Sequence, residues 1–172
     1  PLRLVGSEMC IRDSISSLLT ALGKEMKRIV VGMSGSSGVI YGIRILEILR
    51  ENPEVQTHLI LSHAAKMNIG IETDWALQDV EQLADEVHNI KNISASIASG
   101  SFHTDGMIVV PCSMKTLSGI ANSYAENLII RAADVMLKER RRLVIVPRES
   151  PLHTGHCELM LSLIHISEPT RR

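Results

Sequence analysis

Two short serine-containing segments have the residue types that bind phosphate groups. SGSSG at 34–38 follows the apolar run Arg28–Met33, and PCSMKT at 111–116 overlaps the end of the apolar run Met107–Cys112. Glycine lets a backbone approach a ligand closely, and free N–H groups at a helix start can hold a phosphate or the edge of a flavin ring together with serine hydroxyls. One such loop is a weak signal, but two loops that face the same crevice of one sheet predict a site for a phosphate-bearing ligand.

A charged pair follows a further apolar run. Arg148 and Glu149 come directly after Leu143–Pro147, where Arg148 can bind a phosphate and Glu149 can transfer a proton. The alternative is a surface ion pair, which is usually worth little. Glu72 stands at the end of a predicted helix and, taken alone, is more typical of a solvated carboxylate.

The sequence lacks the motifs that are typical of NAD binding and of metal binding. The pattern GxGxxG is absent, and the second predicted strand ends in Ser62 rather than in Asp or Glu, which disfavours NAD. His153, His156 and Cys157 have no second ligand cluster in the sequence, so we expect no metal site. The run Lys138–Arg142 is interpreted as a solvated helix end, because cations there complement the helix dipole.

Composition narrows the class of protein. The chain has 172 residues, a net charge of −1, 45% hydrophobic and 22% charged residues, which fits one globular α/β domain. Only 2% of the residues are aromatic, too few for a base-stacking nucleic-acid surface. No apolar run approaches the ~18 residues that span a bilayer. The three cysteines are widely spaced and suggest no disulfide framework, so we expect a cytoplasmic protein.

Apolar runs and amphipathic stretches alternate through the middle of the chain. We predict strands at 28–33, 57–62, 107–112 and 143–147, and helices at 39–49, 63–71, 75–87, from 113 onwards and at 127–140. Short apolar strands separated by helices indicate a parallel sheet covered on both faces, a three-layer doubly wound sandwich of the Rossmann or flavodoxin type. Ligands of such sheets bind at the carboxyl ends of the strands, where the segments named above are expected.

The two ends of the chain differ from its middle. VGSEMCIRDS near the start and LSLIHISEPTRR at the end resemble translated sequencing adapters. We therefore expect residues 1–25 to be a non-native or disordered leader, 26–160 to be the domain and 161–172 to be a non-native tail that interrupts a helix beginning near His153. No small-x-small cleavage site follows the apolar stretch 15–22, which disfavours a signal peptide.

From Met26 to about His156 the sequence resembles the UbiX-type flavin prenyltransferases. The likeness is carried by MKRIVVGMSGSSGVIYGIRILEIL, THLILSHAAK, IETD, ASGSF, PCSMKTLSGIANSYAENLIIRAADVMLKERR and LVIVPRESPLH. The resemblance implies transfer of a dimethylallyl group from dimethylallyl phosphate to reduced FMN, without a metal. It also implies that the prenylated FMN serves UbiD-type decarboxylases, for example in ubiquinone biosynthesis, and that the chain forms a homo-oligomer, typically a dodecamer with active sites at subunit junctions.

The resemblance also implies roles for individual residues. Those of the FMN-binding loops and their neighbours are Gly35, Ser36, Ser37, Ser62, Ser113, Met114, Lys115, Thr116 and Arg148. Ser37 would also lie beside the reacting flavin. Glu149 and Glu72 would lie near the prenyl phosphate and the flavin, and Glu149 is the better candidate for proton transfer. Arg131 and Lys138, with Arg148, would form the cationic phosphate site.

Two departures from the family pattern affect what we expect of this chain. Residues 161–172 do not match the family's C-terminal strand and helix, which carry a Tyr and a Lys that contact the prenyl phosphate. Arg142 stands where a proline is usual. We expect an active enzyme in the full-length natural protein, and poor FMN binding and little turnover in this chain. The alternatives are an FMN-dependent cysteine decarboxylase, for which His63 is the nearest candidate catalytic histidine, and a non-catalytic FMN carrier.

Overall fold

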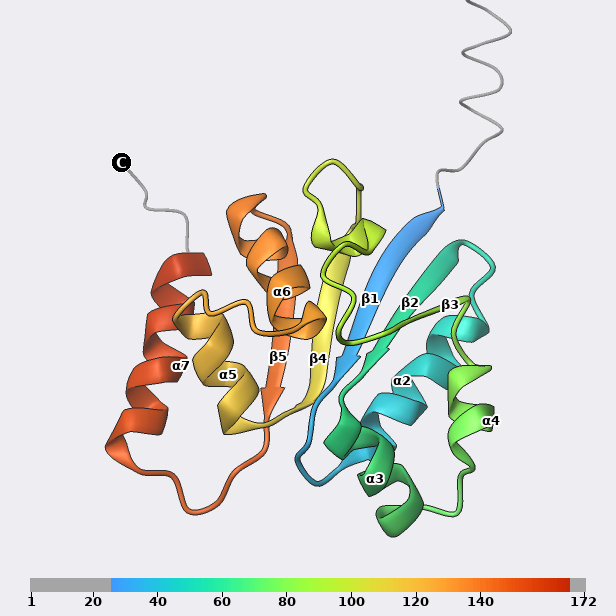
Figure 1. The fold of residues 1–172 in the computed structure, drawn as a ribbon, viewed down its shortest axis with the longest axis horizontal. Coiled ribbons are helices and arrows are strands. Elements are labelled where there is room, and N and C mark those ends of the chain that lie inside the picture. The colour runs from blue at the N-terminus through green and yellow to red at the C-terminus, as the bar shows by residue number, and fades with distance from the viewer. Residues whose placement is uncertain (1–25, 168–172) are drawn as a thin grey trace, which may run out of the picture.

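A computed structural model describes residues 26–167 and shows a parallel sheet with helices on both faces (Figure 1). Its strands are β1 (Lys27–Met33), β2 (Val55–Leu61), β3 (Glu86–His88), β4 (Gly106–Cys112) and β5 (Arg142–Pro147). The strand order is β3-β2-β1-β4-β5, and every pair is parallel. The chain thus winds outward from β1 in both directions, which confirms the doubly wound fold.

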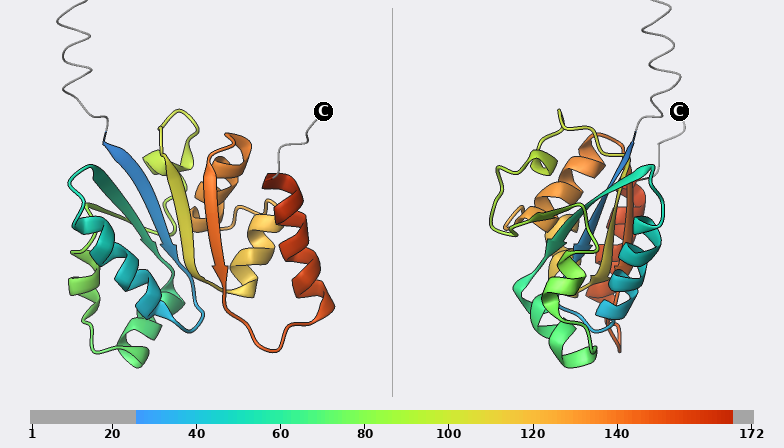
Figure 2. Two further views of the ribbon diagram at one scale, coloured as in Figure 1. Left: turned by 180° about the vertical axis from the view of Figure 1, so that it is seen from behind. Right: turned by 90° about the vertical axis from the view of Figure 1, so that its right-hand side faces the viewer.

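The helices complete the three layers, as the edge-on view of Figure 2 shows. They are α2 (Val39–Arg50), α3 (His63–Glu72), α4 (Leu77–Glu81), α5 (Met114–Ala121), α6 (Leu128–Lys138) and α7 (Thr154–Ser167), with a short 3₁₀ turn, η1 (Ser96–Ala98). Successive side chains of a strand point to opposite faces, so Val30 packs in a core with α5 and α6, and Val31 in a core with α2 and α3. Both valines are fully buried.

The predicted helix at 75–87 is wrong in its second half. Only Leu77–Glu81 is helical, and Glu86–His88 forms the edge strand β3, which pairs with β2. The apolar residues at 76, 80, 83 and 87 fit a helical period, but Asp85 accepts hydrogen bonds from the backbone and hydroxyl of Thr57 at 2.7 and 2.8 Å. These contacts hold the chain against the amino-terminal part of β2, so tertiary pairing overrides the local period.

The expected interruption of the last helix is also wrong. α7 continues to Ser167, beside α5 (Figure 1), and Leu163 is only 8% exposed in the same core as Leu117 of α5. The assignment of 161–172 to a tail outside the domain stays a prediction, and the leader 1–25 lies outside the described residues. Within residues 26–167, no helix combines the length and apolarity needed to cross a membrane.

Candidate functional site

Four of the predicted site segments meet at the carboxyl edge of the sheet, the lower edge in Figure 1. Backbone hydrogen bonds join the residue after each strand to its neighbour: Ser34 N to Pro111 O, Ser62 N to Met33 O and Arg148 N to Cys112 O, each 3.0 Å long. The structure therefore brings together 34–38, Ser62, 113–116 and Arg148, as the sequence predicted from their positions after strands.

The first serine loop is held from the side by α3. Asn68 Nδ2 donates to Ser36 O at 3.2 Å, and Gly38 N donates to Glu72 Oε2 at 2.8 Å. Gly38 has φ of +99°, a left-handed conformation that glycine adopts without strain, and a Cβ on Gly35 would clash with Cβ of Ala64. Glu72 is thus in contact with the first loop, and its carboxylate accepts a loop N–H, while its predicted place near the prenyl phosphate and the flavin stays a prediction.

The helices α2, α3 and α5 begin at this edge, directly after Gly38, Ser62 and Ser113. Ser62 caps α3 by accepting from Ala65 N at 3.0 Å, and Ser113 caps α5 by accepting from Thr116 N at 3.4 Å. Gly38 precedes α2 and has no side chain with which to cap it. Helix N-termini carry partial positive charge and N–H donors, so their convergence favours an anion such as a phosphate.

The two serine loops are joined through a buried hydroxyl. Ser34 is 1% exposed, and its Oγ accepts a hydrogen bond from Ser113 N at 2.7 Å and donates to Pro111 O at 3.1 Å. The sequence predicts Ser34 as one of the phosphate-binding hydroxyls of 34–38, but not that it joins the two loops. The only signal available was a hydroxyl residue directly after a buried strand.

One buried polar atom at this edge is unsatisfied within the described part of the chain. Ser36 Oγ is buried and has no hydrogen-bond partner among residues 26–167. Buried hydroxyls in folded proteins nearly always have a partner, so this atom fits a site that a ligand completes. The serine hydroxyls and helix N-termini suit the phosphate and polar ring edge of FMN, and the residues present therefore fit this group.

The remaining charged residues of the edge are exposed. Glu149 accepts a hydrogen bond from Ser150 N at 3.1 Å, and Lys115 lies 3.2 Å from Glu126. Cys112 does not add a nucleophile, because burial raises the pKa of its thiol to about 12 and keeps it protonated.

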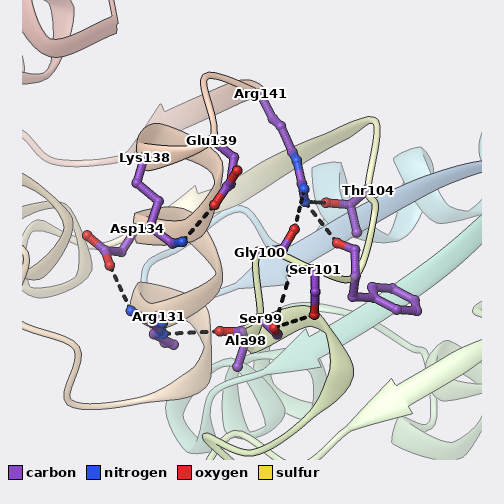
Figure 3. Close-up of polar contacts among 11 residues, drawn as sticks. Ala98, Ser99, Gly100, Ser101, Thr104, Arg131, Asp134, Lys138, Glu139 and Arg141 are labelled. Carbon is purple, nitrogen blue, oxygen red and sulfur yellow. Dashed lines mark hydrogen bonds and ion pairs between the residues drawn. The ribbon is translucent and has the colours of Figure 1, made fainter.

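Arg131 and Lys138 do not join this cluster within one chain. Arg131 donates to Ala98 O at 3.2 Å and pairs with Asp134, and Lys138 pairs with Glu139 at 2.7 Å (Figure 3). Both belong to α6, whose end leads into the start of β5, and they face the segment 98–104. The predicted grouping of these two cations with Arg148 is therefore not seen in the single chain.

A buried histidine pair lies outside the predicted site. His58 Nδ1 and His88 Nε2 are 3.0 Å apart, and the Glu86 carboxylate lies 3.3 Å from His58 and 3.5 Å from His88. These three side chains can be considered as metal ligands. The sequence could not show this cluster, because Glu86 fell in the predicted helix 75–87, His88 came just after it, and no edge strand was expected there.

The geometry of the pair is that of a hydrogen bond. The ring centres are 5.3 Å apart, so the two nitrogens lie close to the line that joins them. To share a metal ion, the lone pairs of the two nitrogens would have to point away from this line and meet at the ion. A hydrogen bond between two neutral imidazoles instead needs the N–H of one ring and the lone pair of the other to lie along the line. Burial lowers the pKa of both His58 and His88, while the Glu86 carboxylate opposes this shift, so the neutral pair is favoured.

Comparison with known proteins gives a consistent family. The flavoprotein family model matches residues 19–166. Flavin prenyltransferase UbiX of Escherichia coli K12 is 54% identical over 141 residues, which cover 82% of this chain and 75% of that protein.

Two solved structures are also similar. A dodecameric FMN-dependent UbiX-like decarboxylase from Escherichia coli O157:H7 has a TM-score of 0.80 and 54% identity, over 81% of this chain and 75% of that one. AnUbiX in complex with FMN and dimethylallyl pyrophosphate has a TM-score of 0.80 and 51% identity, over 82% and 74% of the two chains.

Proposed function

The chain belongs to the flavoprotein family and, within it, to the UbiX-type flavin prenyltransferases, and we propose that it transfers a dimethylallyl group from dimethylallyl phosphate to reduced FMN. The observation that carries this proposal is the convergence of two serine loops and three helix N-termini around the buried, unpartnered Ser36 hydroxyl. We further propose that the prenylated FMN passes to a UbiD-type decarboxylase.

The two loops hold the flavin in this proposal. Gly35, Ser36 and Ser37 follow the central strand β1, between Ser62 after β2 and the segment 113–116 after β4. Reduced FMN supplies the electron-rich ring that accepts the dimethylallyl group. The first-turn N–H groups of α2, α3 and α5 bind anionic and carbonyl oxygens, and Ser37, which is exposed on the loop, faces the reacting partner.

Charged residues act on the departing phosphate. Cleavage of the allylic C–O bond leaves negative charge on the phosphate, which Arg148 stabilises from its place after β5. Glu149, the next residue, is exposed and receives the proton that the acceptor ring releases. Glu72 holds Gly38 N and thereby fixes the loop that carries Ser37.

A second subunit supplies the other two cations. Within one chain, the polar partners of Arg131 and Lys138 are Ala98, Asp134 and Glu139, and none of them belongs to the carboxyl edge that carries Arg148. The similar dodecameric structure supports a homo-oligomer. In this proposal, α6 of one subunit approaches the carboxyl edge of another. Mixing inactive Lys138→Met and Glu149→Gln proteins should then restore part of the activity, because some junctions receive both native side chains. No recovery in re-formed mixed oligomers would contradict the shared site.

Mass spectrometry of the released flavin tests the reaction. After anaerobic incubation with reduced FMN and dimethylallyl phosphate, we expect little product from this chain. In a version extended with the family's C-terminal strand and helix, we expect the flavin to gain the mass of one dimethylallyl group, and Glu149→Gln in that version to keep FMN but lose the product. Bound FMN of unchanged mass in the extended version would favour a non-catalytic FMN carrier. Release of CO₂ from a peptidyl cysteine would favour the cysteine decarboxylase, with His63, exposed at the start of α3, as its candidate histidine.

A further inference from the structure

The Ser34 side chain crosses between the ends of β1 and β4, the two strands from which the chain winds in opposite directions. Its partners, Pro111 O and Ser113 N, lie 77 and 79 residues further along the chain. The hydroxyl is 1% exposed, so water does not substitute for either partner. One buried side chain thus connects the two loops that the proposed function assigns to FMN.

The Ser34 hydroxyl acts on the second loop rather than on the strands themselves. Ser34 N already joins the strand ends through Pro111 O at 3.0 Å, and this bond does not depend on the side chain. The hydroxyl adds the short 2.7 Å bond to Ser113 N. Ser113 Oγ in turn donates to Thr116 Oγ1 at 3.2 Å and caps Thr116 N, so the position of Ser113 sets the first turn of α5.

We propose that Ser34 is a positioning residue that fixes the separation of the two FMN loops. Without its hydroxyl, the half-buried Ser113 N–H loses its acceptor and must turn toward another one, which moves the first turn of α5 away from the first loop. A ligand that contacts both loops must then restore their separation when it binds, and its affinity falls. This inference rests on the proposed function only in that FMN is the ligand; it does not require prenyl transfer.

The experiment compares Ser34→Ala with Thr57→Val in the 172-residue chain. Thr57 is a matched control: it is 1% exposed, and its hydroxyl donates to Asp85 at 2.8 Å, between β2 and the residue before β3. Both variants should lower the melting temperature. Ser34→Ala should raise the Kd for FMN about tenfold in a fluorescence titration, whereas Thr57→Val should change it less than about twofold. Equal FMN affinities in two folded variants would overturn the proposal.

Two further variants test the positioning role of the Ser34 hydroxyl if Ser34→Ala does not fold. Ser34→Thr keeps the hydroxyl and should bind FMN within about threefold of the unmodified chain, and Ser34→Cys, a poor hydrogen-bond partner, should bind distinctly more weakly. Equal affinity of the Thr and Cys variants would overturn the proposal.

A readout without ligand separates this inference from the proposed function. In the FMN-free chain, amide hydrogen exchange should accelerate in both 34–38 and 113–116 when Ser34 is changed to Ala or Cys, and in neither for Thr57→Val. Unchanged exchange at 113–116 would overturn the positioning role even if FMN proved not to be the ligand. Conversely, if the version extended with the family's C-terminal strand and helix binds FMN but never prenylates it, the proposed reaction is contradicted and this result still stands.

Discussion

The amino and carboxyl ends of the strands differ in whether nearby polar groups have hydrogen-bond partners. Near the amino ends, Arg141 donates to Gly100 O, Phe102 O and Thr104 Oγ1 at 2.6, 2.9 and 3.2 Å, so a single side chain fixes the segment 100–104 (Figure 3). At the carboxyl ends, three helices begin and Ser36 Oγ is buried without a partner in the described chain. The segment 100–104 is fixed by the chain's own hydrogen bonds, whereas the first serine loop holds a buried hydroxyl that, in our proposal, a ligand completes.

The largest effect on stability is expected near the amino ends of the strands, where Arg141 holds the segment 100–104. Arg141→Met keeps much of the side-chain volume but removes three hydrogen bonds from a cation, so the free energy of unfolding should fall by about 3 kcal/mol. Urea unfolding measures this, and the Kd for FMN of the folded variant should stay unchanged. A strong loss of FMN affinity with little loss of stability would show that Arg141 serves ligand binding rather than stability, and would contradict the placement of the FMN site at the carboxyl edge.

Helix caps provide a smaller, paired test. Ser62 caps α3 at the carboxyl edge, and Asn127 caps α6 by accepting from Ile130 N at 3.2 Å. Each change to Ala should lower the free energy of unfolding by about 1 kcal/mol. Only Ser62→Ala should also weaken FMN binding, since Ser62 is at the proposed flavin site. Equal FMN affinity of the two variants would remove Ser62 from that site.

The sequence was sufficient for the strands that carry the site. β1, β4 and β5 are short apolar runs, and the rule that ligands bind at carboxyl ends then placed 34–38, 113–116 and Arg148 at one edge. The resemblance to a known family added the identity of the ligand and the role of Glu72, which by spacing alone looked like a solvated carboxylate.

The rest of the arrangement depends on contacts between distant residues. The hydrogen bond between Gly38 and Glu72 joins residues 34 apart in the sequence. The bond between Ser34 and Ser113 joins residues 79 apart. No local sequence pattern predicts contacts over such separations. β3 has only three residues and is defined by its pairing with β2, which an apolar period cannot reveal. The split of Arg131 and Lys138 from Arg148 likewise follows from where α6 lies, not from residue type.

The buried histidine pair predicts a weaker, pH-dependent effect away from the carboxyl edge. Because burial lowers the pKa of His58 and His88 below the usual 6.5, the unfolded chain binds more protons than the folded one at mildly acid pH. Stability from this pair is complete above about pH 6.5 and is lost as pH falls through the lowered folded-state values, and Glu86 reduces the size of the loss.

Urea midpoints measured from pH 7.5 down to pH 5 test this in the unmodified chain and in His88→Asn. The slope with pH should be shallower in His88→Asn, because one titrating group is absent and the other loses a neighbouring positive charge. A midpoint that rises as the pH falls would show that the pair is stabilised by protonation, and would favour a charged cluster with Glu86 over the neutral pair.

The smallest effects on stability are expected from exposed ion pairs. In these pairs, the contribution of a charge to stability can be separated from its contribution to FMN binding. Lys115 pairs with Glu126 and Arg44 pairs with Glu47, and the cationic side chains are 76% and 69% exposed. Each change to Met should leave the urea midpoint of unfolding almost unchanged, because solvent screens such pairs. Lys115→Met should nevertheless weaken FMN binding about threefold at low salt, while Arg44→Met should not, since only Lys115 stands on the second serine loop. If both variants bind FMN equally, Lys115 serves only its surface pair, and the attraction of the carboxyl edge for a phosphate rests on helix N-termini and hydroxyls.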